Sequence, residues 1–121
     1  MPLQYEHVHW ATHNNGFWQS FDLDTSHFID WVVTGIFYEA VHWIEAFLAT
    51  KGLHSRNHKE RSQTMQRYLQ DMGSILVDYD TLELDSRNAR YVCHMHTSEE
   101  VRQDLLPLIT NIRNHISSLL S

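Results

Sequence analysis

The chain has 121 residues, enough for one domain with a hydrophobic core but too few for two. Hydrophobic side chains make up 42% of it and four residues are tryptophan, which excludes a disordered chain. Only four glycines and two prolines are present, too few for the many turns of a sandwich or barrel. The formal net charge of −6 excludes a dedicated nucleic-acid coat protein. We expect a single all-α domain over residues 1–121.

The first predicted helix covers residues 3–19 and is rich in aromatic and histidine side chains. The Asn-Asn-Gly run at 14–16 can split or end this helix, because such residues favour turns. The segment has neither a basic start nor an apolar run, so we expect no signal peptide. Cys93 is the single cysteine, which excludes an intramolecular disulfide and fits a reducing compartment. We therefore expect a cytoplasmic protein.

The second predicted helix has the clearest signals. It follows the capping candidates Asp24, Thr25 and Ser26, and it ends at Gly52, where helices favour a left-handed residue. At about 100° per residue, five polar side chains fall in one stripe with Glu39 beside it, and the rest is apolar. The stripe consists of His27, Asp30, Thr34, His42 and Glu45. We expect a central helix whose stripe faces water, a partner or a site, and whose polar residues make it a poor membrane span.

Two further helices are predicted in the middle of the chain. The first spans residues 57–73, with Asn57 able to cap it and Gly73 able to stop it. The second spans residues 74–91 and has apolar side chains at helical spacing, although part of its pattern also alternates as in a strand. We expect a helix there.

The last predicted helix begins with a capping box formed by Thr97 and Glu100. Its apolar residues recur every three or four positions as far as Leu119. Pro107 lies too far inside for a first-turn proline, so we expect a kink or loose turn at 103–107. Together the segments predict an up-and-down antiparallel bundle of four to five helices.

Charge is distributed unevenly along the chain. Residues 51–67 hold five basic side chains and one acidic one, whereas residues 71–85 hold five acidic side chains and no basic ones. The basic segment predicts a local anion-binding or RNA-binding patch. Its candidate residues are Arg56, His58, Lys59 and Arg61.

Three stretches carry a resemblance to a known family. They are WVVTGIFYEAVHWIEAFLATKG from residue 31, HSRNHKER from residue 54, and SRNARY from residue 86, ahead of the acidic-capped last helix. Together they resemble the HEPN family over roughly residues 25–120, and most of all its small stand-alone members. The resemblance implies a helical bundle that usually dimerises, with roles in RNA cleavage, toxin–antitoxin pairs or defence. It also implies RNA as a partner, whereas in the protein-interaction alternative considered below the partner is a nucleotidyltransferase-like protein or a second copy of this chain.

The resemblance also implies a site. Active HEPN proteins carry an arginine, usually followed by a polar residue, and a histidine four to six positions later. Five residues lie where the resemblance places this pattern: six residues stand between Arg87 and His94, one more position than the pattern has, and five stand between Arg90 and His96. We expect Arg87, Asn88 and Arg90 to hold a phosphate, and His94 and His96 to act as base and acid. The spacing of four intervening residues is absent, so both a divergent endoribonuclease and a noncatalytic module stay open.

Metal-independent RNA cleavage needs a base for the ribose 2′-hydroxyl, cations for the phosphate and an acid for the leaving oxygen. No cofactor is required. The alternative is a noncatalytic protein-interaction or nucleotide-binding module that acts as a dimer.

A second alternative is a His-rich metal-binding bundle, because ten residues are histidine. In two Glu-x-x-His elements, Glu6 with His9 and Glu39 with His42, a carboxylate and an imidazole lie three residues apart and therefore on one helix face. His54 and His58 are four residues apart, and Glu45 is one further inward candidate. Bridging glutamates from other helices are not evident, so we predict no metal site.

Overall fold

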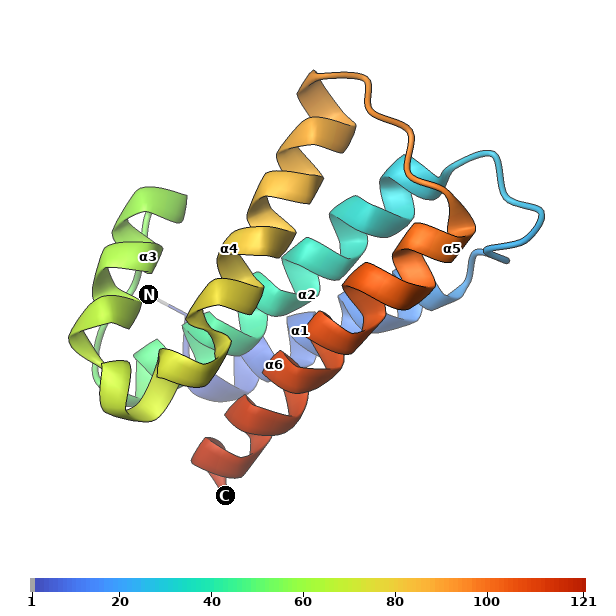
Figure 1. Ribbon diagram of the computed structural model, residues 1–121. Helices are drawn as coiled ribbons and strands as arrows, with labels where there is room; N and C mark the ends of the chain where they lie inside the picture. Colours follow the sequence, from blue (N-terminus) through green and yellow to red (C-terminus); the bar gives the residue numbers. More distant parts are fainter. Residues whose placement is uncertain (1) are drawn as a thin grey trace.

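The computed structural model describes residues 2–121. Four helices come first: α1 (Gln4–Gln19), α2 (Ile29–Thr50), α3 (His58–Arg67) and α4 (Leu69–Tyr91). The short helix α5 (Ser98–Glu100), the π-helical turn η1 (Val101–Leu105) and α6 (Leu106–Leu120) then run on as one continuous terminal rod. The long elements run up and down, and short α3 flanks α4 (Figure 1). No strand occurs in residues 2–121, so the all-α bundle is confirmed.

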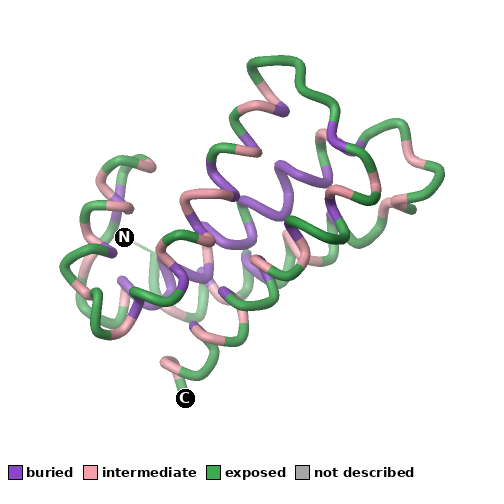
Figure 2. Tube along the Cα trace, in the orientation of Figure 1, coloured by how far each residue is buried: buried purple, intermediate pink, exposed green. Residues whose placement is uncertain are grey.

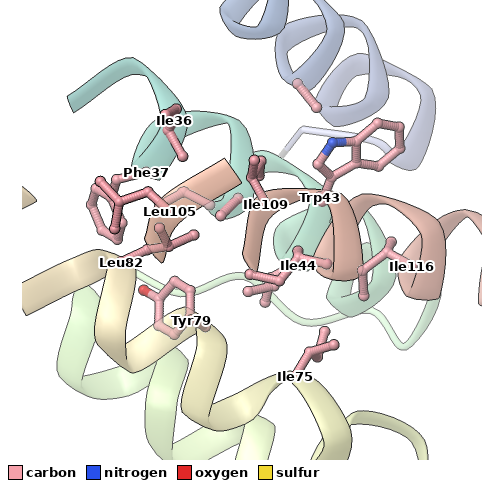
Figure 3. Close-up of a cluster of buried hydrophobic side chains, with 14 of the residues drawn as sticks. Ile36, Phe37, Trp43, Ile44, Ile75, Tyr79, Leu82, Leu105, Ile109 and Ile116 are labelled. Carbon is pink, nitrogen blue, oxygen red and sulfur yellow. The ribbon is translucent and has the colours of Figure 1, made fainter. Parts of the chain in front are cut away.

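Helix α2 lies at the centre of the bundle. Sixteen of its 22 residues are buried, and it packs against α1, α4 and α6 (Figure 2). Its Ile44 lies among Ile75 of α4 and Ile109 and Ile116 of α6 (Figure 3). Within residues 2–121, α2 alone is long and apolar enough to cross a membrane. Because 83% of its most apolar window is buried in the protein, the bundle itself accounts for this hydrophobicity.

Helix α1 packs closely on α2 at Gly35. A Cβ atom added there would lie 3.0 Å from Cβ of Trp18 and 3.1 Å from the Phe17 ring. Only glycine leaves room for this approach. The Asn-Asn-Gly run at 14–16 does not break α1, because its two asparagine side chains form hydrogen bonds in the folded protein. Asn14 donates to the carbonyl of Trp10 at 2.9 Å, and the helix continues to Gln19.

A buried carboxylate joins three helices. Glu39 of α2 has no exposed surface. Its oxygens accept hydrogen bonds from Trp18 Nε1 at 2.8 Å and Asn15 Nδ2 at 3.0 Å on α1, and from Trp43 Nε1 at 2.8 Å. Arg113 of α6 adds a two-pronged ion pair at 2.8 and 3.2 Å. The charge is thus fully compensated, which is the condition for burying it.

The start of α2 differs from the sequence prediction. Its N-cap is Phe28, which makes no side-chain cap, so capping by Asp24, Thr25 or Ser26 was wrong. Asp24 instead pairs with Arg102 at 2.8 Å, and this guanidinium lowers the carboxyl pKa of Asp24. The prediction for the other end is confirmed, because Gly52 follows α2 with φ +71°.

The boundary between α3 and α4 also differs. Asn57 caps α3 as predicted, since its side chain accepts the amide of Glu60 at 2.9 Å. The predicted stop at Gly73 was wrong, because the chain turns at Tyr68 and Gly73 lies inside α4. Tyr68 packs edge-on against Phe47 of α2 at 5.8 Å, a tertiary contact that fixes the turn. The strand alternative for residues 74–91 is excluded, because all of them are helical.

The terminal rod begins as predicted. Thr97 and Glu100 form both hydrogen bonds of a capping box. Pro107 has no amide hydrogen, and its ring would collide with the carbonyl four residues earlier in a regular α-helix. The wider π-helical turn Val101–Leu105 takes up this conflict, which confirms the predicted loose turn.

Candidate functional site

The loop at residues 92–97 joins α4 to the terminal rod and carries the two candidate histidines. Helix α4 ends where Cys93 adopts φ +58°, a left-handed conformation unusual for a residue other than glycine. The amides of Val92 and His94 both donate to the carbonyl of Asn88, at 3.1 and 3.2 Å. Asn88 therefore shapes the loop through its backbone.

His96 is 4% exposed, and its Nε2 lies 3.2 Å from Oδ1 of Asp85 on α4. Its Nδ1 is buried and has no hydrogen-bond partner. A carboxylate accepts only, so the neutral ring carries its hydrogen on Nε2 and leaves a free lone pair on Nδ1. A carboxylate that orients an imidazole in this way is the usual arrangement around a general base.

His94 lies beside it. The two ring centroids are 4.5 Å apart, edge to face. The His94 side chain is 49% exposed, and its Nε2 lies 3.9 Å from a carboxylate oxygen of Glu100. A hydrogen bond from the Thr97 amide lowers the pKa of Glu100, so this carboxylate is ionised and pairs with His94 whenever the ring is protonated.

A hollow of about 350 Å³ adjoins this loop. One wall is Met95, His96 and Thr97, and the other comes from the loop before α2 and includes Ser26 and His27. The two loops lie at the same end of the bundle (Figure 1). The hollow therefore offers a polar binding surface next to the His94–His96 pair.

The candidate arginines point elsewhere. Arg87 binds Glu83 at 3.0 Å. Arg90 donates to the Tyr38 hydroxyl at 2.9 Å, and its guanidinium lies 5.1 to 5.8 Å from the ring centres of three aromatic side chains, Phe37, Tyr38 and Tyr91. Among the described residues neither arginine forms a hydrogen bond with His94 or His96. The structure thus brings the histidines together and keeps both arginines apart from them.

Most of the predicted anion-binding patch is already paired. Arg61 is 8% exposed and binds Glu45 at 3.1 Å and the Tyr79 hydroxyl at 3.0 Å. Arg56 binds Glu60 at 2.8 Å on the surface. Lys59 is exposed and has no ion pair in the described chain. A free anion would therefore meet Lys59 first.

His58 connects the patch with α4. Its Nδ1 lies 3.1 Å from the Tyr79 hydroxyl and its Nε2 lies 3.7 Å from Glu83. Burial raises the pKa of Tyr79 to about 12, so its hydroxyl remains protonated. A continuous polar chain results, which runs Glu45, Arg61, Tyr79, His58, Glu83, Arg87. Arg61 and His58 of the predicted anion-binding patch and Arg87 of the predicted Arg/His site thus belong to one network.

Several residues of these clusters were missed by sequence reasoning. The spacing of Glu83 and Arg87 by four positions is a signal for an ion pair on a helix. Asp85 and Tyr38 carried no such signal, because their partners His96 and Arg90 lie across the fold.

The Glu39–His42 pair is not available as a metal site, because Glu39 binds the Trp18, Trp43 and Arg113 groups instead. His9 is exposed on α1. Among the described residues 2–121, no three His, Cys, Asp or Glu side chains are arranged so that they could hold a metal ion.

No family model, curated protein or solved structure matches this chain.

Proposed function

We propose that this protein is a HEPN-like, RNA-associated protein of the cytoplasm that cleaves RNA without a metal ion. The observation that carries the proposal is the Asp85–His96 pair, whose unpartnered Nδ1 is a base with a fixed tautomer. The neighbouring His94 and the adjoining hollow support it. The HEPN resemblance in the sequence supplies the substrate class.

The reaction assigns one proton transfer to each histidine. Nδ1 of His96 takes the proton of a ribose 2′-hydroxyl, and the oxygen attacks the adjacent phosphorus. The bond to the 5′-oxygen breaks, and protonated His94 gives that oxygen a proton. The products are a 2′,3′-cyclic phosphate and a 5′-hydroxyl. Because Nδ1 is buried, the loop at 92–97 opens when RNA binds; its residues 92–95 are exposed.

We propose that Arg87 and Arg90 contribute to the site in a dimer of this protein. Trp31 and Tyr91 are 52% and 73% exposed, and Tyr38 on the same side binds Arg90. Aromatic and arginine side chains are enriched in protein interfaces. A second copy packed on this face would place two loops near each other in one composite site. The biological settings that fit are a toxin–antitoxin pair or a defence system, with a nucleotidyltransferase-like protein as partner.

Labelled single-stranded RNA tests the proposal. The chelator-treated protein is incubated with RNA in EDTA and compared with His96→Ala, Asp85→Asn and the control His9→Ala, whose residue is exposed on α1. We expect cyclic-phosphate ends from the wild type and the control, a loss of about 100-fold or more in His96→Ala, and a smaller loss with a changed pH profile in Asp85→Asn.

Wild-type RNA cleavage that disappears in EDTA, or that persists in His96→Ala, would refute the mechanism. Binding of RNA without cleavage would favour the noncatalytic module. Light scattering tests the dimer, and a monomer at micromolar concentration would remove the composite site.

A further inference from the structure

A small recess of about 240 Å³ lies between α2 and α4. It is lined by Asp30, Trp31 and Thr34 of α2 and by Ala89 and Arg90 of α4. The start of α2 and the end of α4 lie at the same end of the bundle as the loop at 92–97 (Figure 1). Ile29 lines the hollow next to this loop, and the following residue, Asp30, lines the recess. The recess and the hollow therefore open beside neighbouring residues of the same helical turn.

The recess holds one acceptor and one donor group that the fold leaves unused. Among the described residues no group donates to the Asp30 carboxylate, because the Thr34 hydroxyl donates to the backbone carbonyl of Asp30 instead, at 2.9 Å. The guanidinium of Arg90 has five N–H donors. It uses one on the Ser86 carbonyl at 3.3 Å and one on the Tyr38 hydroxyl at 2.9 Å, so three remain. Asp30 and Arg90 form no ion pair with each other in the described chain.

The donor is already in position before a ligand binds. The two hydrogen bonds of Arg90 and the rings of Phe37, Tyr38 and Tyr91 hold its guanidinium at the end of α4. A guanidinium that is fixed in this way loses little conformational entropy on binding. On the other wall, the indole of Trp31 is 52% exposed. Unpaired bases of RNA stack on such aromatic side chains and form hydrogen bonds through their edges.

We propose that this recess binds an unpaired guanine base of RNA. Guanine presents two neighbouring donors, N1–H and the N2 amino group, which match the two oxygens of one carboxylate, and its O6 and N7 accept from arginine. Asp30 accepts the two donors, Arg90 donates to O6 and N7, and Trp31 stacks on the ring. Because Asp30 and Arg90 come from opposite walls, they reach two different edges of the base.

The other three bases lack this pattern. Uracil offers a single donor between two carbonyl oxygens, which a carboxylate repels. Adenine and cytosine each offer one amino group beside an acceptor nitrogen, so only one carboxylate oxygen is satisfied. The negative charge of Asp30 also disfavours a phosphate in the recess, so the base enters it and the backbone stays outside.

This inference deepens the proposed function and rests on RNA being the substrate. A guanine in the recess places the neighbouring phosphodiester toward the hollow beside His96, because both openings adjoin the start of α2. Asp30 is then a specificity-determining residue, and RNA is cleaved next to guanine.

Binding of short fluorescein-labelled 2′-O-methyl RNA strands tests the recess, measured by fluorescence anisotropy. These strands have no free 2′-hydroxyl and are not cleaved, so the wild-type protein is used. One strand is oligouridine, and the others carry a single central guanine, adenine or cytosine. The variants are Asp30→Asn and Trp31→Ala, and the control is Asp104→Asn, the same carboxylate-to-amide change at an exposed residue of the terminal rod.

We expect the wild type and the control to bind the guanine strand at least about fivefold more tightly than the other three. Asp30→Asn should reduce this preference to less than about twofold, whereas Trp31→Ala should weaken binding of every strand about fivefold or more. Equal binding of all four strands by the wild type, or an unchanged preference in Asp30→Asn, would overturn the proposal. GMP that binds as tightly as the guanine strand would overturn the assignment to RNA.

The two proposals fail separately. RNA cleavage by the wild type without a preference for guanine leaves the proposed function standing and removes the recess. Guanine-selective binding without cleavage of ordinary RNA supports the recess and removes the ribonuclease.

Discussion

Replacement of Glu39 by alanine should strongly destabilise the bundle. The substitution removes the acceptor of five hydrogen bonds, two of them from the buried indole nitrogens of Trp18 and Trp43. Each buried donor left without a partner costs about 1–3 kcal/mol. The Arg113 side chain is 28% exposed, so water compensates part of its loss. We expect the free energy of unfolding to fall by about 4 kcal/mol, within the range for breaking one side of a buried ion pair.

Urea unfolding followed by far-UV circular dichroism measures this loss. Tryptophan fluorescence is unsuitable, because two indoles contact the mutated carboxylate. Glu39→Gln keeps one acceptor oxygen and should lose about 2 kcal/mol. Asp104→Asn is the control, since Asp104 is exposed on the terminal rod, and it should change stability by less than about 0.5 kcal/mol.

A loss below about 1 kcal/mol for Glu39→Ala would refute the reasoning, because it would mean that the network contributes no more than one ordinary hydrogen bond. A double-mutant cycle with Arg113→Met separates the ion pair from the indole contacts. Free-energy losses that simply add would show that Glu39 and Arg113 do not interact.

Three further predictions concern single residues. Thr97→Ala removes the capping box and should lower the free energy of unfolding by about 1 kcal/mol in urea; an unchanged midpoint would contradict the cap. Cys93→Asn should raise it by about 0.5–1 kcal/mol, because asparagine tolerates φ +58° better, whereas a lower midpoint would show that the thiol packs usefully. Tyr79 should ionise at about pH 12 in the folded protein, followed as tyrosinate absorbance, and Tyr79→Phe should remove that step. Because folding raises the pKa of Tyr79, the contribution of its protonated hydroxyl to the free energy of unfolding is complete below pH 10 and is lost as the pH rises toward 12. A free energy of unfolding that rises between pH 10 and 12 would contradict this direction of the pKa shift.

Helical periodicity was sufficient to predict the all-α class and the approximate positions of the helices. Local signals that depend on one turn of chain also held, as Asn57, Thr97 and Gly52 show. The failures lie where tertiary contacts compete with local preference. Asp24 pairs with Arg102 rather than capping α2, and Gly73 lies inside a helix because the Tyr68 contact places the turn earlier.

The candidate site divides in the same way. The sequence by itself determined that His94 and His96 stand just before a capped helix, because both features lie within a few neighbouring residues. Only the tertiary structure decided which partners they have. Asp85, near the end of α4, pairs with His96, whereas Arg61 forms an ion pair with Glu45, 16 residues earlier in the chain. A periodic pattern records which face of a helix is apolar, but it does not record which buried donor meets which buried acceptor, since that pairing depends on how the helices cross.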